Sequence, residues 1–447
     1  MAEIKRFRLL IIGKTGCGKT TILSKLCGDD VADMPTAHER GKHDIERELD
    51  FRTNDKLVAH DSEGFEAGEE AQYRVVTEFI RRRGTMQDVN QRLHMVWYCV
   101  EMNTRPVQMA EEQFFGAKRD VPVIAIFTKF DNYVEDMVQQ IQEEAEDDDP
   151  PKPLSEVDKL AEEKAQESFK DNYRSRLEKL PFPPEAIVAL SRTHESTPED
   201  SRLSELVRQT MAALIPSDDS RMTPERRQEQ ERLRELFVTA QTADLTVKVE
   251  NAIATSMRIG YESLGKRPIE RQRLIDLWNT KWSSQDSKSF SWLNRQLQQH
   301  VDFSPRLIGH ENSPDFNQVE QWNEQLRQCA ALEEMVSDSV IIMRYIFLLS
   351  TKDQAQVQRL IEWYDGNSSV AKQLREALVS KHSQNPKNNV GLKPLDLITI
   401  VSGLTFEAPD IKVSAEVKSG TRLPAASAEP QKGLFSKIFK KKDKHNK

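Results

Sequence analysis

Residues near the N-terminus have the types and spacing needed to hold a polyphosphate. The run Gly13-Lys14-Thr15-Gly16-Cys17-Gly18-Lys19-Thr20 fits G-x-x-x-x-G-K-[ST] and follows an apolar run at residues 7–12. Glycines allow a tight turn that points successive N–H groups at phosphate oxygens, and the helix expected at 19–27 adds its positive end. Lys19 would neutralise the outer phosphates and Thr20 would bind a magnesium ion. The sequence therefore predicts a phosphate-binding loop.

A second motif follows the third expected strand, at residues 56–60. Asp61-Ser62-Glu63-Gly64 fits D-x-x-G. Its aspartate can hold a magnesium-bound water, and its glycine N–H can meet the terminal phosphate of a triphosphate. Asp61 is thus a predicted metal residue, and Gly64 is predicted to sense the phosphate.

A third motif follows the strand expected at residues 121–127. Thr128-Lys129-Phe130-Asp131 fits the [NT]-K-x-D pattern of guanine-nucleotide binders. A carboxylate accepts the N1 and N2 hydrogens of guanine together, whereas adenine lacks this pair of donors. Asp131 is predicted to select guanine, with the Lys129 stem lying over the base.

Two further contacts are expected from loops. Thr36 lies sixteen residues after Thr20 and could reach the magnesium ion and the terminal phosphate. The alternative is that Thr36 is a solvated loop residue. Thr53 is a poorer candidate for the same role because it lies beyond the expected edge strand. The last base-contacting loop is assigned by position to Ser191-Arg192, which follows the strand expected at 186–190. The usual motif of this loop is Ser-Ala or Ser-Ala-Lys, and Arg192 stands in place of its alanine.

The order of expected elements indicates how these residues are positioned. Strands and helices alternate through the first half of the chain, which predicts an α/β fold with a doubly wound, mainly parallel sheet. Ligands of such sheets bind beyond the carboxyl ends of the strands. The expected strands are 7–12, 46–52, 56–60, 93–102, 121–127 and 186–190, and the helices are 19–27, 69–83, 107–118 and 202–214.

Composition excludes several classes of protein. The chain has 447 residues and a formal charge of −8, with basic residues scattered except at the C-terminus, so no nucleic acid partner is expected. The N-terminus lacks a secretory pattern, and the longest apolar run, 340–349, is too short to span a bilayer. Four cysteines without paired spacing suit an intracellular protein. We therefore expect a cytoplasmic protein, soluble or peripheral on a membrane.

With these motifs the chain resembles a P-loop GTPase of the translation-factor class. The loop and the run His94-Met95-Val96-Trp97-Tyr98-Cys99-Val100-Glu101, leading through Arg105-Pro106 to Val121-Pro122-Val123-Ile124, resemble septins and immunity-associated (paraseptin-type) GTPases. They also resemble uncharacterised fungal proteins recognised only by a G domain. The resemblance covers residues 1–216.

The resemblance also implies how hydrolysis is completed. Small Ras-like GTPases place a glutamine directly after D-x-x-G to orient the attacking water, whereas this chain has Phe65. Relatives with apolar residues there complete the site by pairing G domains. Slow intrinsic hydrolysis is thus implied, with the missing group supplied by a partner or by another loop; Glu63, His38 and Arg40 are nearby polar residues.

The rest of the chain divides into three parts. Residues from about 135 to 180 form an acidic helical insert in the G domain at 1–216, whose apolar stripe (Val157, Ala161, Ala165, Phe169, Tyr173) packs on the G domain or forms a partner interface. Residues 217–409 are predicted to form an all-α domain that binds a protein partner or follows the nucleotide state, with a dynamin-like stalk as an alternative. Residues 410–447 form a flexible linker and a basic amphipathic tail, which contacts a membrane or remains solvated.

The sequence thus predicts a magnesium-dependent GTPase acting as a switch or assembly protein, with GTP and GDP as ligands and a G-domain homodimer or oligomer as an expected assembly. The alternatives are a GTP-binding scaffold with negligible turnover and a membrane-remodelling, dynamin-like GTPase. The predicted catalytic residues are Lys19, Thr36 and Gly64, and the metal residues are Thr20, Thr36 and Asp61. The predicted GTP-binding residues are Gly13, Lys14, Thr15, Gly16, Cys17, Gly18, Lys19, Thr20, Thr21, Asp61, Gly64, Thr128, Lys129, Asp131, Ser191 and Arg192.

Overall fold

The computed structural model divides into two compact units. One comprises residues 1–252 and 270–287, and the other comprises 253–269 and 288–447. The residues that the structure describes are 4–27, 44–51, 54–62, 70–102, 109–144, 153–193, 202–214, 223–262, 278, 287–300, 324–349, 353–384 and 391–406. Thr36, Gly64 and the tail at 410–447 lie outside them, as do His38, Arg40, Glu63 and Phe65.

A six-stranded sheet forms the centre of the first unit, in the order β2-β3-β1-β4-β5-β6. Its strands are β1 (Phe7–Gly13), β2 (Leu49–Phe51), β3 (Asn54–Asp61), β4 (Met95–Glu101), β5 (Val123–Thr128) and β6 (Ala186–Ala189). All neighbouring pairs are parallel except β2 with β3, which are antiparallel. The prediction of a mainly parallel α/β sheet is therefore confirmed.

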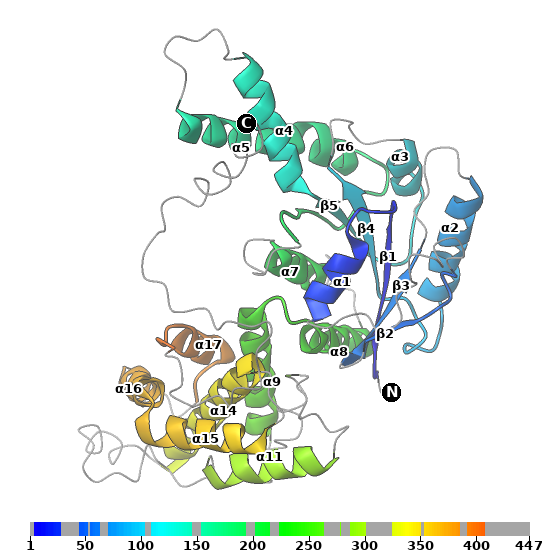
Figure 1. The fold of residues 1–447 in the computed structure, drawn as a ribbon. Coiled ribbons are helices and arrows are strands. Elements are labelled where there is room, and N and C mark those ends of the chain that lie inside the picture. The colour runs from blue at the N-terminus through cyan, green and yellow to red at the C-terminus, as the bar shows by residue number, and fades with distance from the viewer. Residues whose placement is uncertain are drawn as a thin grey trace. The chain divides into compact units, whose positions relative to one another are not determined.

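Helices cover both faces of this sheet (Figure 1). One face carries α1 (Lys19–Cys27), α7 (Leu203–Ala213) and α8 (Pro224–Ala240), and the other carries α2 (Glu70–Gly84), α3 (Met109–Phe115) and the start of α4 (Phe130–Glu144). Successive residues of β1 alternate between the two cores, with Leu9 and Ile11 on the α1 face and Leu10 and Ile12 on the α2 face. Burial on both faces explains why this strand is apolar at every position from Leu9 to Ile12.

The direction of the connections reverses at the carboxyl end of β1. The helix that follows β1 lies on one face, whereas α2 and α3, which follow the neighbouring strands β3 and β4, lie on the other. In open α/β sheets such a reversal separates the loops beyond the strand ends and leaves room for a ligand. The phosphate-binding loop predicted from the sequence is the connection from β1 to α1.

The insert forms a helical hairpin that packs on the sheet unit. After α4 come α5 (Leu154–Ser168), a π-helical turn η1 (Phe169–Arg174) and α6 (Ser175–Glu178). The predicted stripe is buried: Val157 and Ala161 pack with α4, while Ala165, Phe169 and Tyr173 join the core on the α2 face of the sheet. This burial favours packing on the sheet unit over a partner interface for the stripe.

The sheet unit extends beyond the boundary expected at residue 216. Leu233 and Phe237 of α8 belong to the core on the α1 face of the sheet. The Phe237 ring lies 5.1 Å from the ring of Phe7 and 6.3 Å from that of Trp97, between centroids. The helix has Thr223 as its capping residue and Pro224 in its first turn, two residue types that favour a helix start at these positions.

The turn from α8 to α9 (Leu245–Glu262) is bonded to the end of α1. The Thr242 backbone N–H donates to the Leu26 carbonyl at 2.6 Å. The Asp244 carboxylate accepts from the Val247 N–H and pairs with Arg208 of α7 at 3.2 Å. These contacts satisfy the ends of α1 and α9 and fix the turn on the sheet unit.

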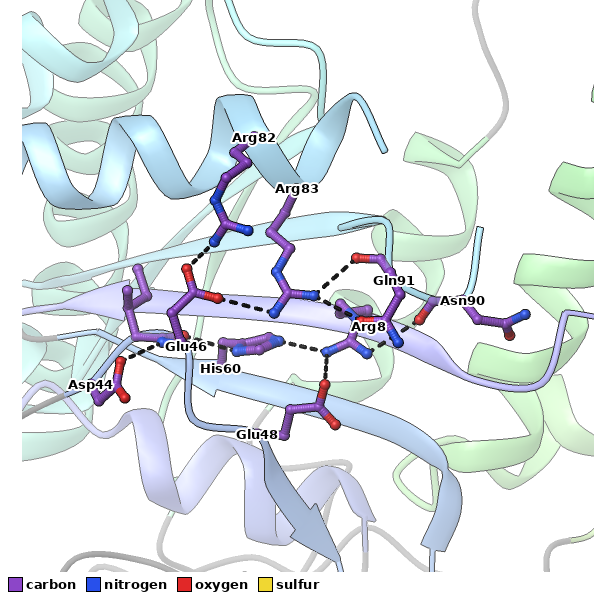
Figure 2. Close-up of polar contacts among 10 residues, drawn as sticks. Arg8, Asp44, Glu46, Glu48, His60, Arg82, Arg83, Asn90 and Gln91 are labelled. Atoms are coloured by element: carbon purple, nitrogen blue, oxygen red, sulfur yellow. Dashed lines mark hydrogen bonds and ion pairs between the residues drawn. The ribbon is translucent and has the colours of Figure 1, made fainter. Parts of the chain in front are cut away.

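An ion network around the buried Arg8 and His60, on the α2 face, holds the segment before β2 to β1 and β3 (Figure 2). The sequence analysis did not anticipate this network. The Arg8 guanidinium donates to Glu48 Oε1 at 2.6 Å and to His60 Nε2 at 2.8 Å. His60 Nδ1 donates to the Ile45 carbonyl at 2.9 Å. Glu46 pairs with Arg82 and Arg83 of α2.

His60 is neutral in this network because its Nε2 accepts from a guanidinium and only its Nδ1 carries a proton. Burial, together with the Arg8 charge, lowers the pKa of His60 to about 4. His94, whose Nδ1 accepts from the Arg8 backbone N–H, has its pKa lowered by burial to about 3. Both histidines therefore stabilise the fold in their neutral forms.

Every described element of the second unit is a helix: part of α9, α11 (Ser287–His300), α14 (Glu324–Leu349), α15 (Gln354–Asn367), α16 (Ser369–Ser383) and α17 (Pro394–Ser402). Its core holds polar pairs on α14. Glu333 bonds to His382 at 2.5 Å, and the Tyr364 hydroxyl donates to Asp338 at 2.6 Å. Among the helices described in the chain, none is both long and apolar enough to cross a bilayer.

Candidate functional site

The loop between β1 and α1 has the backbone that a phosphate cradle requires. Gly13, Gly16 and Gly18 adopt positive φ angles of 150°, 83° and 87°. A Cβ on Gly13 would lie 2.4 Å from the Cys99 carbonyl oxygen and 2.8 Å from Cys17 Sγ. Glycine is therefore needed at position 13 for both its φ angle and its space, whereas at 16 and 18 the φ angle alone requires it.

Lys19 stands in the first turn of α1, with its ammonium group folded back over the loop. Its Nζ donates to the carbonyl oxygens of Gly13 at 2.6 Å and Lys14 at 3.3 Å. The same Nζ lies 3.8 Å from Asp61 Oδ1 at the end of β3. The parallel pairing of Ile11 with Asp61 brings this carboxylate beside the loop. The structure thus joins the first two sequence motifs through Lys19.

Two thiols lie beneath the loop. Cys17 and Cys99 are buried, and a hydrogen bond from the Cys99 thiol, assisted by the Lys19 charge, lowers the pKa of Cys17. Burial raises the pKa of Cys99. The lower pKa of Cys17 therefore comes first from the Cys99 hydrogen bond and next from the nearby Lys19 charge.

The predicted base-recognition residues converge at the ends of β5 and β6. The Asp131 carboxylate, in the first turn of α4, accepts a hydrogen bond from the Arg192 backbone N–H at 3.0 Å. The Phe130 N–H donates to the Leu190 carbonyl at 3.0 Å. These bonds place the Ser191-Arg192 loop against Asp131, where the sequence put it by position alone.

Lys129 adopts an unusual backbone and has a partner that the sequence analysis did not assign. Its φ angle is 58°, in the left-handed region that residues with a Cβ rarely occupy. Its Nζ lies 2.7 Å from Glu101 Oε1 at the end of β4. Parallel strands that end at one edge bring Glu101 near Lys129, since β4 directly neighbours β5, but the ion pair itself depends on the conformation of Lys129.

The other predicted site residues lie at the start of α1 or outside the described residues. Thr36 and Gly64 lie outside the described residues. Thr20 is exposed at the start of α1, and Thr21 beside it is half-buried. Within the described ranges no group of three or more His, Cys, Asp or Glu side chains could hold a metal ion alone. The Thr20 hydroxyl and the Asp61 carboxylate are hard oxygen donors, which suit a magnesium ion that takes its other ligands from phosphate and water.

Comparison with known proteins adds little beyond this geometry. No protein-family model matches the chain, and no curated protein matches it. Among solved structures it is similar to a bacterial selenocysteine-specific elongation factor, with 18% sequence identity and a TM-score of 0.24. The match covers 47% of this chain and 29% of the elongation factor. Such a low TM-score carries no argument about function, and the likeness to septins and immunity-associated GTPases stays a prediction.

Proposed function

We propose that this protein binds guanine nucleotides with magnesium and hydrolyses GTP to GDP and phosphate. The observation that supports the proposal is the convergence of three sequence motifs at one edge of the sheet. Lys19 connects the glycine loop with Asp61, and Asp131 is bonded to the loop at 191–192. A phosphate chain would lie on the loop at β1, and a base would lie at the ends of β5 and β6.

Charge and hydrogen bonding assign the roles. Lys19 and the first N–H groups of α1 would neutralise the phosphates, and Thr20 and Asp61 would hold the magnesium ion directly and through water. Bound magnesium would offset the charge that develops on the phosphate oxygens. Asp131 would accept the two N–H donors of guanine, with Lys129 covering the ring and Ser191-Arg192 closing the pocket.

Hydrolysis needs a group that orients the attacking water. Thr36 and Gly64 would contact the terminal phosphate, but Phe65 has no group to orient a water molecule. We infer a slow intrinsic rate that a partner or another loop raises, since an arginine supplied in trans can accelerate the reaction by about 10³ to 10⁵. The same phenylalanine favours a second candidate, a GTP-binding scaffold with negligible turnover. Multiple-turnover phosphate release separates the two.

Competition binding tests the proposed ligand. GDP, GTP, ADP and ATP would each be titrated as competitors against a fluorescent GDP analogue bound to the nucleotide-free protein. The proteins compared are the wild type, Asp131→Asn and the control Asp136→Asn, which changes an exposed position of α4. Hydrogen bonds to a charged group contribute about 1.5–3 kcal/mol, so Asp131→Asn should weaken GDP binding by about 10- to 100-fold. Asp136→Asn should match the wild type. Equal affinity of the wild type for GDP and ADP would refute the assignment.

The dynamin-like alternative concerns the helical part at 217–409, whereas peripheral membrane attachment concerns the tail at 410–447, which lies outside the described residues. Liposome sedimentation with and without GTP tests both. Sedimentation that requires GTP and forms higher assemblies would favour membrane remodelling, and sedimentation regardless of nucleotide would favour a simple basic anchor.

A further inference from the structure

Glu101 occupies a fixed place beside the base-recognition motif. The parallel register of β4 and β5 pairs Glu101 with Thr128, so both strands end at the same level. The Met102 N–H donates to the Thr128 carbonyl at 2.9 Å, which holds the two strand ends together directly after Glu101. The backbone that carries this carboxylate is therefore set by the sheet.

Lys129 reaches Glu101 from a constrained turn. Its φ angle of 58° reverses the chain between β5 and α4, and its carbonyl accepts from the Tyr133 N–H at 3.3 Å in the first turn of that helix. From this conformation the ammonium group meets Glu101 Oε1 at 2.7 Å. A left-handed residue with a long side chain is held only where the surrounding structure fixes it, and such residues gather at functional sites.

The ion pair adds little to the stability of the fold. Both side chains are 38% exposed, and exposed pairs of this kind are weak because water screens them. A lysine stem, however, has many rotamers, and ordering it when a ligand arrives costs affinity. A partner that orders the stem beforehand removes part of that cost.

We propose that Glu101 is a positioning residue for guanine-nucleotide binding, which orders Lys129 so that the lysine stem lies ready to cover the base. This inference rests on the proposed function. It assigns no contact between Glu101 and the nucleotide, because the ammonium group of Lys129 mediates its effect.

The sign of the effect separates this role from general electrostatics. Nucleotides are polyanions, so removing a nearby carboxylate should tighten binding if only charge mattered, mainly through faster association. Removing a positioning residue should weaken binding instead, mainly through faster dissociation. Glu112 on α3 is exposed and allows the same change of charge in the same unit, away from Lys129.

A double-mutant cycle with fluorescent GDP tests the inference in the full-length protein. We expect Glu101→Gln to raise the Kd by about fivefold, equivalent to about 1 kcal/mol, with most of the change in the dissociation rate. In a Lys129→Ala background, Glu101→Gln should have no further effect, since no stem remains to be ordered. Glu112→Gln should leave the Kd unchanged, and urea unfolding should be alike for all variants.

The outcomes are distinguishable. Unchanged or tighter GDP binding by Glu101→Gln, or an equal effect in the Lys129→Ala background, overturns the positioning role while leaving the proposed function intact. If the wild type itself fails to prefer GDP over ADP, the proposed function and this inference both fall.

Discussion

Replacing Gly13 with alanine tests whether the phosphate loop has the backbone described above. The new methyl group would lie 2.4 Å from the Cys99 carbonyl oxygen, within the space where atoms repel strongly. Gly13 pairs with Cys99 across β1 and β4, so this oxygen cannot retreat without disturbing the centre of the sheet. The Cys17 thiol at 2.8 Å can rotate away at lower cost.

The magnitude follows from two separate penalties. A residue with a Cβ held at a φ angle of 150° costs about 1–3 kcal/mol, and crowding by one extra carbon in a packed core costs a similar amount. Together they should lower the free energy of unfolding by about 2–6 kcal/mol, a large part of a domain's stability. Gly16→Ala is the matched control, because a Cβ there meets no atom within 4 Å and only its φ angle of 83° costs about 1 kcal/mol.

Urea unfolding of the nucleotide-free protein, followed by far-UV circular dichroism, measures both variants. Gly13→Ala should unfold at clearly lower urea than Gly16→Ala, and Gly16→Ala should remain close to the wild type. If the two variants unfold at the same urea concentration, then the close approach of Gly13 to β4 is not a feature of the folded protein, and the account of the loop is wrong.

The remaining predictions concern buried ionisable groups. Because the pKa values of His60 and His94 are about 4 and about 3 in the folded protein, the unfolded chain binds protons at these residues first as the pH falls below 6.5. The free energy of unfolding should therefore fall by about 2 kcal/mol for each histidine between pH 6.5 and pH 5. In urea titrations His60→Gln should lose about half as much stability over this range as the wild type. A loss in the variant equal to that of the wild type would contradict the assignment of His60 as a buried, neutral residue. Lys248, whose pKa burial lowers to about 7, donates to the carbonyl oxygens of Val238 and Thr239 at the end of α8. Lys248→Met should therefore destabilise the protein by about 1–3 kcal/mol at pH 7, and a neutral or stabilising result in calorimetry would show that these carbonyls need no donor.

The parts of the fold that local sequence determines were predicted well. The helix after the glycine loop has the bounds expected for it, Lys19–Cys27, because the glycine and lysine pattern fixes its start. The sheet, and the strands that run into the three motifs, could be predicted because short apolar runs alternate with segments that have helical periodicity. The sequence placed the loop at 191–192 near the base-recognition motif by position alone, and its hydrogen bond to Asp131 is seen only in the structure.

Features set by tertiary contacts were not predictable in this way. The stripe of Leu233 and Phe237 on α8 has the period of any amphipathic helix, and nothing local shows whether it packs on a sheet or on other helices. Arg8 interrupts an apolar run, and its burial could not be predicted because its partners lie far along the chain. Glu48 comes from the segment before β2 and His60 comes from β3. The role of Glu101 depends on the conformation of Lys129, which no sequence pattern specifies.

The most direct test of the central claim is the release of phosphate from GTP and from ATP, with magnesium, across a range of protein concentrations for the wild type and Lys19→Ala. The account predicts turnover of GTP alone, rising per molecule with concentration as G domains pair, and lost in Lys19→Ala because the outer phosphates are no longer neutralised. Tight GTP binding without turnover would point to the scaffold. Equal use of ATP, or full activity of Lys19→Ala, would contradict the assignment of this edge of the sheet as a GTPase site.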